Sequence, residues 1–173
     1  MSKWKIYTPE GVQDILFEEC YIKRNLEEKI RKLFRSYGYF EIETPSIEFY
    51  DVFCSDQDQI PQEVMFKFFD QQGRILVLRP DITIPVARVT ATKYKDLDQP
   101  LRFFYIDKTY RYNELGGGKQ KEFTQAGVEI MGSAAPESDA EVIATAISAM
   151  QAAGVENFQL DIGQVEFFKG LME

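Results

Sequence analysis

The stretch from Tyr110 to Gly132 reads YRYNELGGGKQKEFTQAGVEIMG, and its pattern decides the fold. After the glycines it alternates like a β-strand with one polar face, and that face carries Gln125, Gly127 and Glu129. Arg111 ends the aromatic run that precedes the glycines. A cation, an amide, an anion and a gap on one sheet face would suit a small zwitterion, although an ordinary hairpin with a solvated polar face shows the same pattern.

Composition limits the classes of protein to which the chain can belong. Its 173 residues, 45% hydrophobic and 14% aromatic, are enough for one domain with a sizeable core. A net charge of −8 disfavours broad electrostatic binding to nucleic acid. Cys20 and Cys54 lack metal-site spacing, and no apolar run is long enough to cross a bilayer. We therefore expect a cytoplasmic protein that holds no metal and no cofactor.

The chain contains no histidine. This absence excludes Ser-His and Cys-His nucleophile pairs, histidine metal ligands and the usual general base near neutral pH. The nucleotide-binding patterns GxGxxG and GxxxxGK[ST] are also missing, and the three glycines at 116–118 fit a surface hairpin loop as well as a phosphate cradle. Any catalysis would depend on positioning, electrostatics or carboxylates.

Three helices are predicted from apolar spacings of three and four and from candidate capping residues. Asp14 would cap the first helix, which runs to about residue 37 and ends at Gly38. The second helix would begin near Thr83, with that threonine as its cap. The third would begin at Ser138, in a capping box with Glu141, and would run to about residue 153.

Short runs rich in aromatic and β-branched residues predict strands between these helices. The runs cover residues 39–42, 65–70, 74–78, 101–112, 122–131 and 158–162, and Gly73 marks a tight turn between the second and the third. The helices are interspersed too irregularly for a doubly wound parallel fold. The chain is therefore predicted to be an α+β domain built on an antiparallel sheet.

A second polar group lies in residues 78–83, LRPDIT. If this segment is extended, its alternate residues Arg79, Asp81 and Thr83 share a face. Asp81 could instead be an exposed turn residue, as Thr83 could be a helix cap. Carboxylates at Asp81 and Glu129 could hold an ammonium group or a protonated ring, and Arg111 could hold a carboxylate. That combination would fit an amino acid.

Taken together, these segments resemble the class II aminoacyl-tRNA synthetases, and within them the histidyl-tRNA synthetase branch. The matching segments are residues 8–14 (TPEGVQD), which resemble the opening of that branch; 39–45, the first class motif; 78–83, the histidine-pocket segment; and 110–129, the second class motif. The resemblance covers nearly the whole chain. It implies a synthetase-like antiparallel sheet flanked by helices, and a homodimer whose interface lies near Pro45.

Within this family the resemblance favours a regulatory subunit of ATP phosphoribosyltransferase over a histidine-activating synthetase core, which is the alternative. The second motif of a synthetase contains Arg-x-Glu, and its glutamate helps to hold adenine, but this chain has Arg111-Tyr112-Asn113. Lys119 and Lys121 stand where synthetases carry arginines, and lysine lacks the bidentate fork. Such a regulatory subunit is not catalytic. Its partner is a short catalytic subunit, with which it confers histidine feedback on the first step of histidine biosynthesis.

The resemblance also implies roles for single residues. Asp81, which stands where a glutamate is common, and Thr83 would contact the amino group of a bound histidine. Arg111 would lie near the histidine carboxylate, and Gln125 and Glu129 would complete the pocket. A third reading, a stand-alone amino-acid-binding or dimerisation module, stays open.

The extent of the chain gives one further expectation. The third class motif, the second histidine signature and the anticodon-binding domain of the family do not occur in it. We therefore expect residues 1–173 to be one synthetase-like core domain, the N-terminal fragment of a longer subunit, with a naturally short subunit as the alternative. By itself it is expected to bind histidine weakly or not at all.

Overall fold

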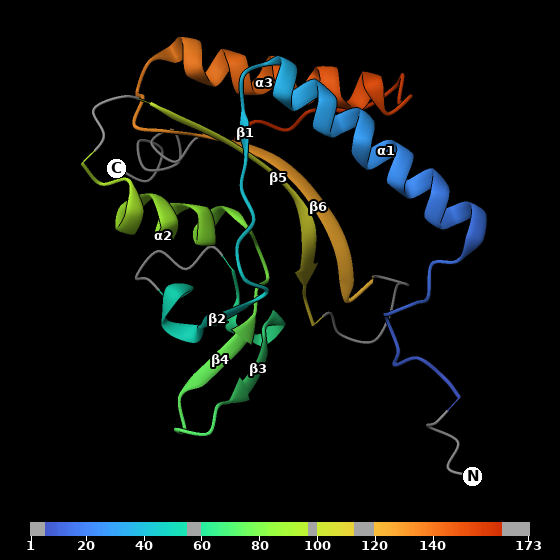
Figure 1. Cartoon of the computed structure of the whole chain (residues 1–173), viewed down its shortest axis with the longest axis vertical. Coiled ribbons are helices and arrows are strands. Elements are labelled where there is room, and N and C mark those ends of the chain that lie inside the picture. Colours follow the sequence, from blue (N-terminus) through green and yellow to red (C-terminus); the bar gives the residue numbers. More distant parts are fainter. Residues whose placement is uncertain (1–5, 55–59, 97–99, 113–119, 164–173) are drawn as a thin grey trace, which may run out of the picture.

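Two three-stranded sheets and three α-helices form the described part of the chain, residues 6–54, 60–96, 100–112 and 120–163 of this computed structural model (Figure 1). The first sheet has the strand order β1-β5-β6 and the second the order β2-β4-β3. The helices are α1 (Phe17–Ser36), α2 (Thr83–Lys93) and α3 (Pro136–Ala152), with short 3-10 turns η2 (Tyr50–Val52) and η3 (Gln62–Val64). The strands are β1 (Phe40–Glu41), β2 (Ile47–Phe49), β3 (Phe66–Phe69), β4 (Ile75–Leu78), β5 (Leu101–Tyr110) and β6 (Glu122–Met131).

The hairpin of β5 and β6 is the longest strand pair of the described structure. It is antiparallel over ten residues, from Leu101 opposite Met131 to Tyr110 opposite Glu122. β1 adds to the free side of β5 in parallel. The two strands were predicted at these positions, and the predicted α+β fold with an antiparallel sheet is confirmed.

Helices cover both faces of this sheet, as Figure 1 shows. On one face α1 and α3 lie side by side and enclose a core of Phe34, Tyr39 and Phe104. On the other face α2 packs through Val86 onto β5, mainly against Phe103 and Tyr105. Because successive side chains of a strand point to opposite faces, Phe104 belongs to the first core and its two neighbours to the second.

The second sheet contains the predicted hairpin at residues 65–78. β4 pairs with β3 on one side and with β2 on the other, both antiparallel. Gly73 has φ +77 at the turn, a conformation that favours glycine, and Asp70 Oδ1 accepts from the backbone N–H groups of Gln72 and Arg74. Val77 points inward and is fully buried in the core of this sheet.

Arg79 links the two sheets from a fully buried position just after β4. Its guanidinium donates to the carbonyl oxygens of Thr44 and Lys108 and lies 2.6 Å from Asp107 Oδ2. Its own backbone donates to Ser46 O and accepts from the N–H of Tyr110. One side chain therefore satisfies backbone groups from the segment before β2 and from β5, which would otherwise be buried without partners.

The second helix begins at Thr83, as predicted, but the predicted starts of the first and third helices were wrong in detail. Leu16, not Asp14, occupies the N-cap position of α1, and no side chain caps that helix. α3 begins at Pro136, whose fixed φ suits the first helical position, so the predicted capping box of Ser138 and Glu141 does not form. Ser138 Oγ instead lies 2.7 Å from Ser133 Oγ, and Glu141 forms an ion pair with Arg102 on β5.

Two further expectations concern the later part of the chain. The strand predicted at 158–162 was wrong, because those residues form no strand. Asn113, the three glycines and Lys119 lie outside the described residues.

Cys20 and Cys54 are free cysteines. Within the described ranges no helix has both the length and the apolar character to cross a membrane.

Replacing Arg79 by methionine should destabilise the protein by about 3 kcal/mol. This value is at the lower end of the range for breaking a buried ion pair, because its partner Asp107 is partly exposed. The loss would be read from urea unfolding. The matched control is Arg24→Met, which removes an arginine whose side chain is 72% exposed and which pairs with Glu27. That control should change stability by less than about 1 kcal/mol. Equal effects of the two substitutions would contradict the role of Arg79.

Candidate ligand-binding site

Four of the five predicted site residues come together where the first turn of α2 meets β6. Thr83 Oγ1 donates to Glu129 Oε1 at 2.7 Å. Gln125 Nε2 lies 3.4 Å from Asp81 Oδ2. We call Asp81, Thr83, Tyr105, Gln125 and Glu129 the polar cluster. The alternation of β6 and the start of a helix at residue 83 place these side chains on one face of the sheet.

Tyr105 stands at the centre of the polar cluster, and sequence reasoning did not single it out. Its hydroxyl lies 3.3 Å from Glu129 Oε1 and 3.4 Å from both Thr83 Oγ1 and Gln125 Nε2. The tyrosine lies directly opposite Gly127 in the strand register. A Cβ at that glycine would lie 2.4 Å from the hydroxyl, so only glycine leaves room for it. A glycine inside a strand signals such a close approach, and the hairpin register would have identified the residue facing it.

Asp81 has two tasks, one for each carboxylate oxygen. Oδ1 accepts from the backbone N–H of Ile84 and so caps the start of α2, while Oδ2 faces Gln125. The cap that sequence reasoning considered for Thr83 is therefore supplied by Asp81. The hydroxyl of Thr83 is left free to bond Glu129.

Arg111 lies beside the polar cluster rather than inside its hydrogen bonds. Its Nε donates to Pro80 O at 2.9 Å, next to Asp81 in the chain. Its guanidinium stacks at 5.6 Å from the ring centroid of Phe123, a typical cation–π distance. Its backbone N–H donates to Lys121 O just before β6. The predicted cation is thus held at the edge of the same sheet face.

The polar cluster concentrates negative charge. Burial raises the pKa of Glu129; the bonds from Thr83 and Tyr105 act in the opposite direction, and the nearby charge of Asp81 raises it further. Burial also raises the pKa of Tyr105, so its hydroxyl stays protonated and can donate. Gln125 Oε1 is buried and has no hydrogen-bond partner in the described structure. Two carboxylates and a free acceptor oxygen suit a ligand that brings a cation with N–H donors.

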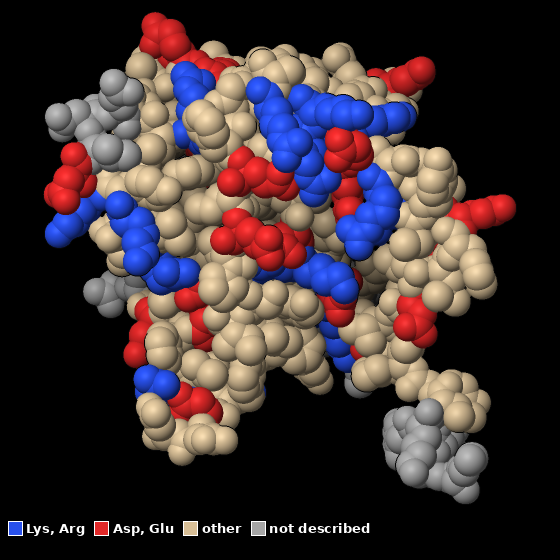
Figure 2. Space-filling model, viewed as in Figure 1, with Lys and Arg blue, Asp and Glu red and all other residues tan. Residues whose placement is uncertain are grey.

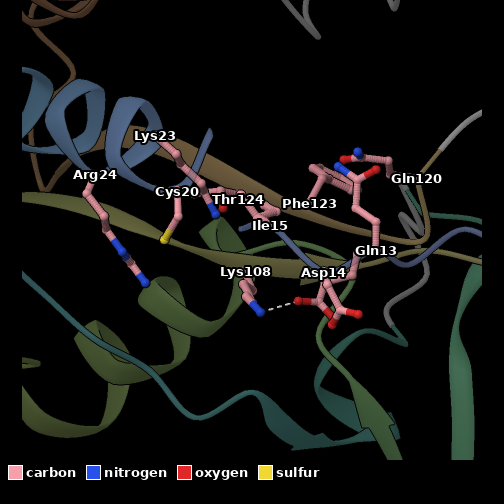
Figure 3. A pocket seen from close by; sticks show the side chains of 11 residues that line it. Gln13, Asp14, Ile15, Cys20, Lys23, Arg24, Lys108, Gln120, Phe123 and Thr124 are labelled. Carbon is pink, nitrogen blue, oxygen red and sulfur yellow. Dashed lines mark ion pairs between the residues drawn. The ribbon is translucent and has the colours of Figure 1, made fainter. Parts of the chain in front are cut away.

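A cavity of about 520 Å³ lies on the opposite face of the hairpin, between the start of α1 and the ends of β5 and β6 (Figure 3). Lys108 and Glu122 form an ion pair within it, and Lys23 and Arg24 both pair with Glu27. It shares no residue with the polar cluster. Within the described ranges no group of three or more Cys, Asp or Glu side chains is placed to hold a metal ion.

Replacing Glu129 by glutamine should stabilise the unliganded protein by roughly 0.5–2 kcal/mol at pH 7, because a half-buried charge is removed while an acceptor oxygen for Thr83 is kept. The pKa of Glu129 is higher in the folded than in the unfolded protein. The wild type therefore loses stability as the pH rises from the unfolded-state pKa to the folded-state pKa, and the variant does not. The gain should therefore vanish in acid. Urea unfolding between pH 4 and 8 would measure it.

The control for this series is Glu156→Gln, which changes an exposed carboxylate and should show no such dependence on pH. A Glu129→Gln variant that is destabilised equally at every pH would contradict the buried-charge account.

Comparison with known proteins identifies the family. A family model described as histidyl-tRNA synthetase matches residues 11–173. The ATP phosphoribosyltransferase regulatory subunits of Acetivibrio thermocellus and Ruminiclostridium cellulolyticum are 72% and 64% identical over the whole chain, which spans 41% of the length of each.

Solved structures agree with this result. One is a structure from Bacillus halodurans titled ATP phosphoribosyltransferase regulatory subunit/histidyl-tRNA synthetase. The match covers 88% of the present chain and 39% of the Bacillus chain, with 38% identity and a TM-score of 0.79. Apo histidyl-tRNA synthetase from S. aureus matches 85% of the chain and 34% of its own with 32% identity and a TM-score of 0.71. The chain belongs to the histidyl-tRNA synthetase family.

Proposed function

We propose that the full-length protein is the regulatory subunit of an ATP phosphoribosyltransferase, without catalytic activity of its own. The observation that carries this proposal is the 72% identity, over the entire chain, to a relative with that name. A short catalytic subunit is its partner, and the pair carries out the first step of histidine biosynthesis in the cytoplasm. The free cysteines fit a reducing compartment.

A histidyl-tRNA synthetase is the weaker alternative. Identity to the synthetase from S. aureus is 32%, less than half the identity to the regulatory subunit from Acetivibrio thermocellus. The run Arg111-Tyr112-Asn113 also lacks the glutamate that a synthetase would place against adenine. Asparagine cannot supply that charge, which argues against ATP binding in the synthetase manner.

The ligand of the polar cluster is histidine, the end product whose level the complex senses. Asp81, Thr83, Gln125 and Glu129 receive its amino group or its ring, and Arg111 lies near its carboxylate. Two observations support this assignment. The half-buried carboxylate of Glu129 and the buried acceptor Gln125 Oε1 favour a cationic donor, and Arg111 is held one residue away from Asp81, through Pro80.

A mixing experiment tests the regulatory role. The full-length protein alone should transfer no phosphoribosyl group to ATP, whereas its addition to a short catalytic subunit should raise that subunit's rate at least about tenfold, and histidine should lower the stimulated rate. Pyrophosphate release would report the reaction. A catalytic subunit whose rate is the same with and without the protein would refute the proposal.

The same subunit forms a homodimer through the outer face of the second sheet. In the strand register, six apolar side chains share this face, and none of them is fully buried: Ile47, Phe49, Phe66, Phe68, Leu76 and Leu78. Figure 2 shows uncharged surface over the middle of the lower part of the molecule, where this sheet lies, with charged side chains along its left edge. Because the chain carries a net charge of −8, two copies can approach most easily through an uncharged face.

Ile47→Glu tests this interface, since Ile47 is 48% exposed and belongs to the outer face, on the edge strand β2. The variant should raise the dissociation constant of the full-length dimer at least about tenfold, measured by sedimentation. Phe69→Glu is the matched control, because Phe69 is 73% exposed but alternates to the other face of the same sheet. A monomeric wild type, or equal effects of the two substitutions, would contradict the dimer.

A further inference from the structure

Tyr105 combines a fixed ring with a hydroxyl inside the polar cluster. The residue is only 3% exposed, and its ring packs in the core with Ile82, Val86 and Phe103. On β6 the tyrosine faces Gly127, and its hydroxyl fills the space that any side chain at position 127 would need. The ring is therefore held on both sides, so the position of its hydroxyl is set by the core rather than by a ligand.

The hydrogens of the polar cluster can be assigned from its geometry. A hydroxyl carries one hydrogen, and those of Thr83 and Tyr105 both point at Glu129 Oε1. The tyrosine oxygen then offers only lone pairs to Gln125, whose Nε2 lies 3.4 Å away. The second amide hydrogen of Gln125 faces Asp81 Oδ2. Both hydrogens on Nε2 are thus used, and the amide has one orientation.

This orientation decides what the site can accept. With Nε2 turned to Tyr105 and Asp81, the carbonyl oxygen of Gln125 is left buried without a partner. A buried acceptor of this kind is costly until a donor reaches it. A flipped amide would present N–H groups instead, and these would repel an ammonium group.

We infer that Tyr105 is a positioning residue that orients the Gln125 amide, so that the site selects ligands carrying a primary ammonium group. This inference rests on the proposed histidine site and adds to it a residue that contacts the ligand only through Gln125. Phenylalanine at position 105 would keep the ring but remove the acceptor that fixes the amide. The site would then lose its preference for the ammonium group more than its general affinity.

The test compares histidine with its desamino analogue, imidazolepropionate, by calorimetry on the full-length protein. Tyr105→Phe should weaken histidine binding at least tenfold and imidazolepropionate binding less than threefold, so that the ratio of the two affinities falls. Tyr39→Phe is the matched control, because Tyr39 is equally buried but lies in the core on the other sheet face. It should leave both affinities and their ratio unchanged.

A double-mutant cycle separates positioning from loss of structure. Gln125→Leu alone should lower the same ratio, and adding Tyr105→Phe to it should lower the ratio no further. A Tyr105→Phe protein that keeps the wild-type ratio, or additive effects in the cycle, would overturn the role of Tyr105. A wild type that stimulates the catalytic subunit but binds no histidine would overturn the proposed site together with this inference, and would leave the regulatory role standing.

Discussion

The antiparallel register of β5 and β6 is the constraint on which the rest of the molecule depends. It sets Tyr105 opposite Gly127 and places Gln125 and Glu129 on the same face as that tyrosine. The other face of the same hairpin carries Phe104 and Val128 into the core under α1 and α3. A shift of one residue would exchange the two faces, burying the amide and the carboxylate under the helices. The polar cluster and the core are therefore specified by one set of strand hydrogen bonds.

The segment at 78–83 supplies both a link between the two sheets and two members of the polar cluster. Arg79 turns into the interior and joins the two sheets through carbonyl groups and Asp107. Asp81 and Thr83, which follow it, turn toward β6, and Asp81 also caps α2. The carboxylate of Asp81 therefore joins the start of α2 to the polar cluster. A rigid, buried arginine two residues away keeps the backbone of this segment in place.

Periodic patterns predicted the elements well, because alternation and turn residues act locally. The strand at 122–131 and the turn at Gly73 follow from such patterns, as does the shared face of Gln125 and Glu129. Helix starts were less predictable. Thr83 satisfies the local rule for a cap, but a long-range bond to Glu129 competes for its hydroxyl. Tyr105 was missed because its role depends on the strand register and not on its neighbours in sequence.

We propose that the polar cluster binds histidine for regulation and takes no part in adenylate chemistry. Histidine-dependent exchange of pyrophosphate into ATP, measured on the full-length protein, tests this claim most directly. The account predicts no exchange above the background found without histidine, because no glutamate follows Arg111-Tyr112 to hold adenine. Exchange that requires histidine and is abolished by Glu129→Gln would contradict the account and identify the protein as a working synthetase.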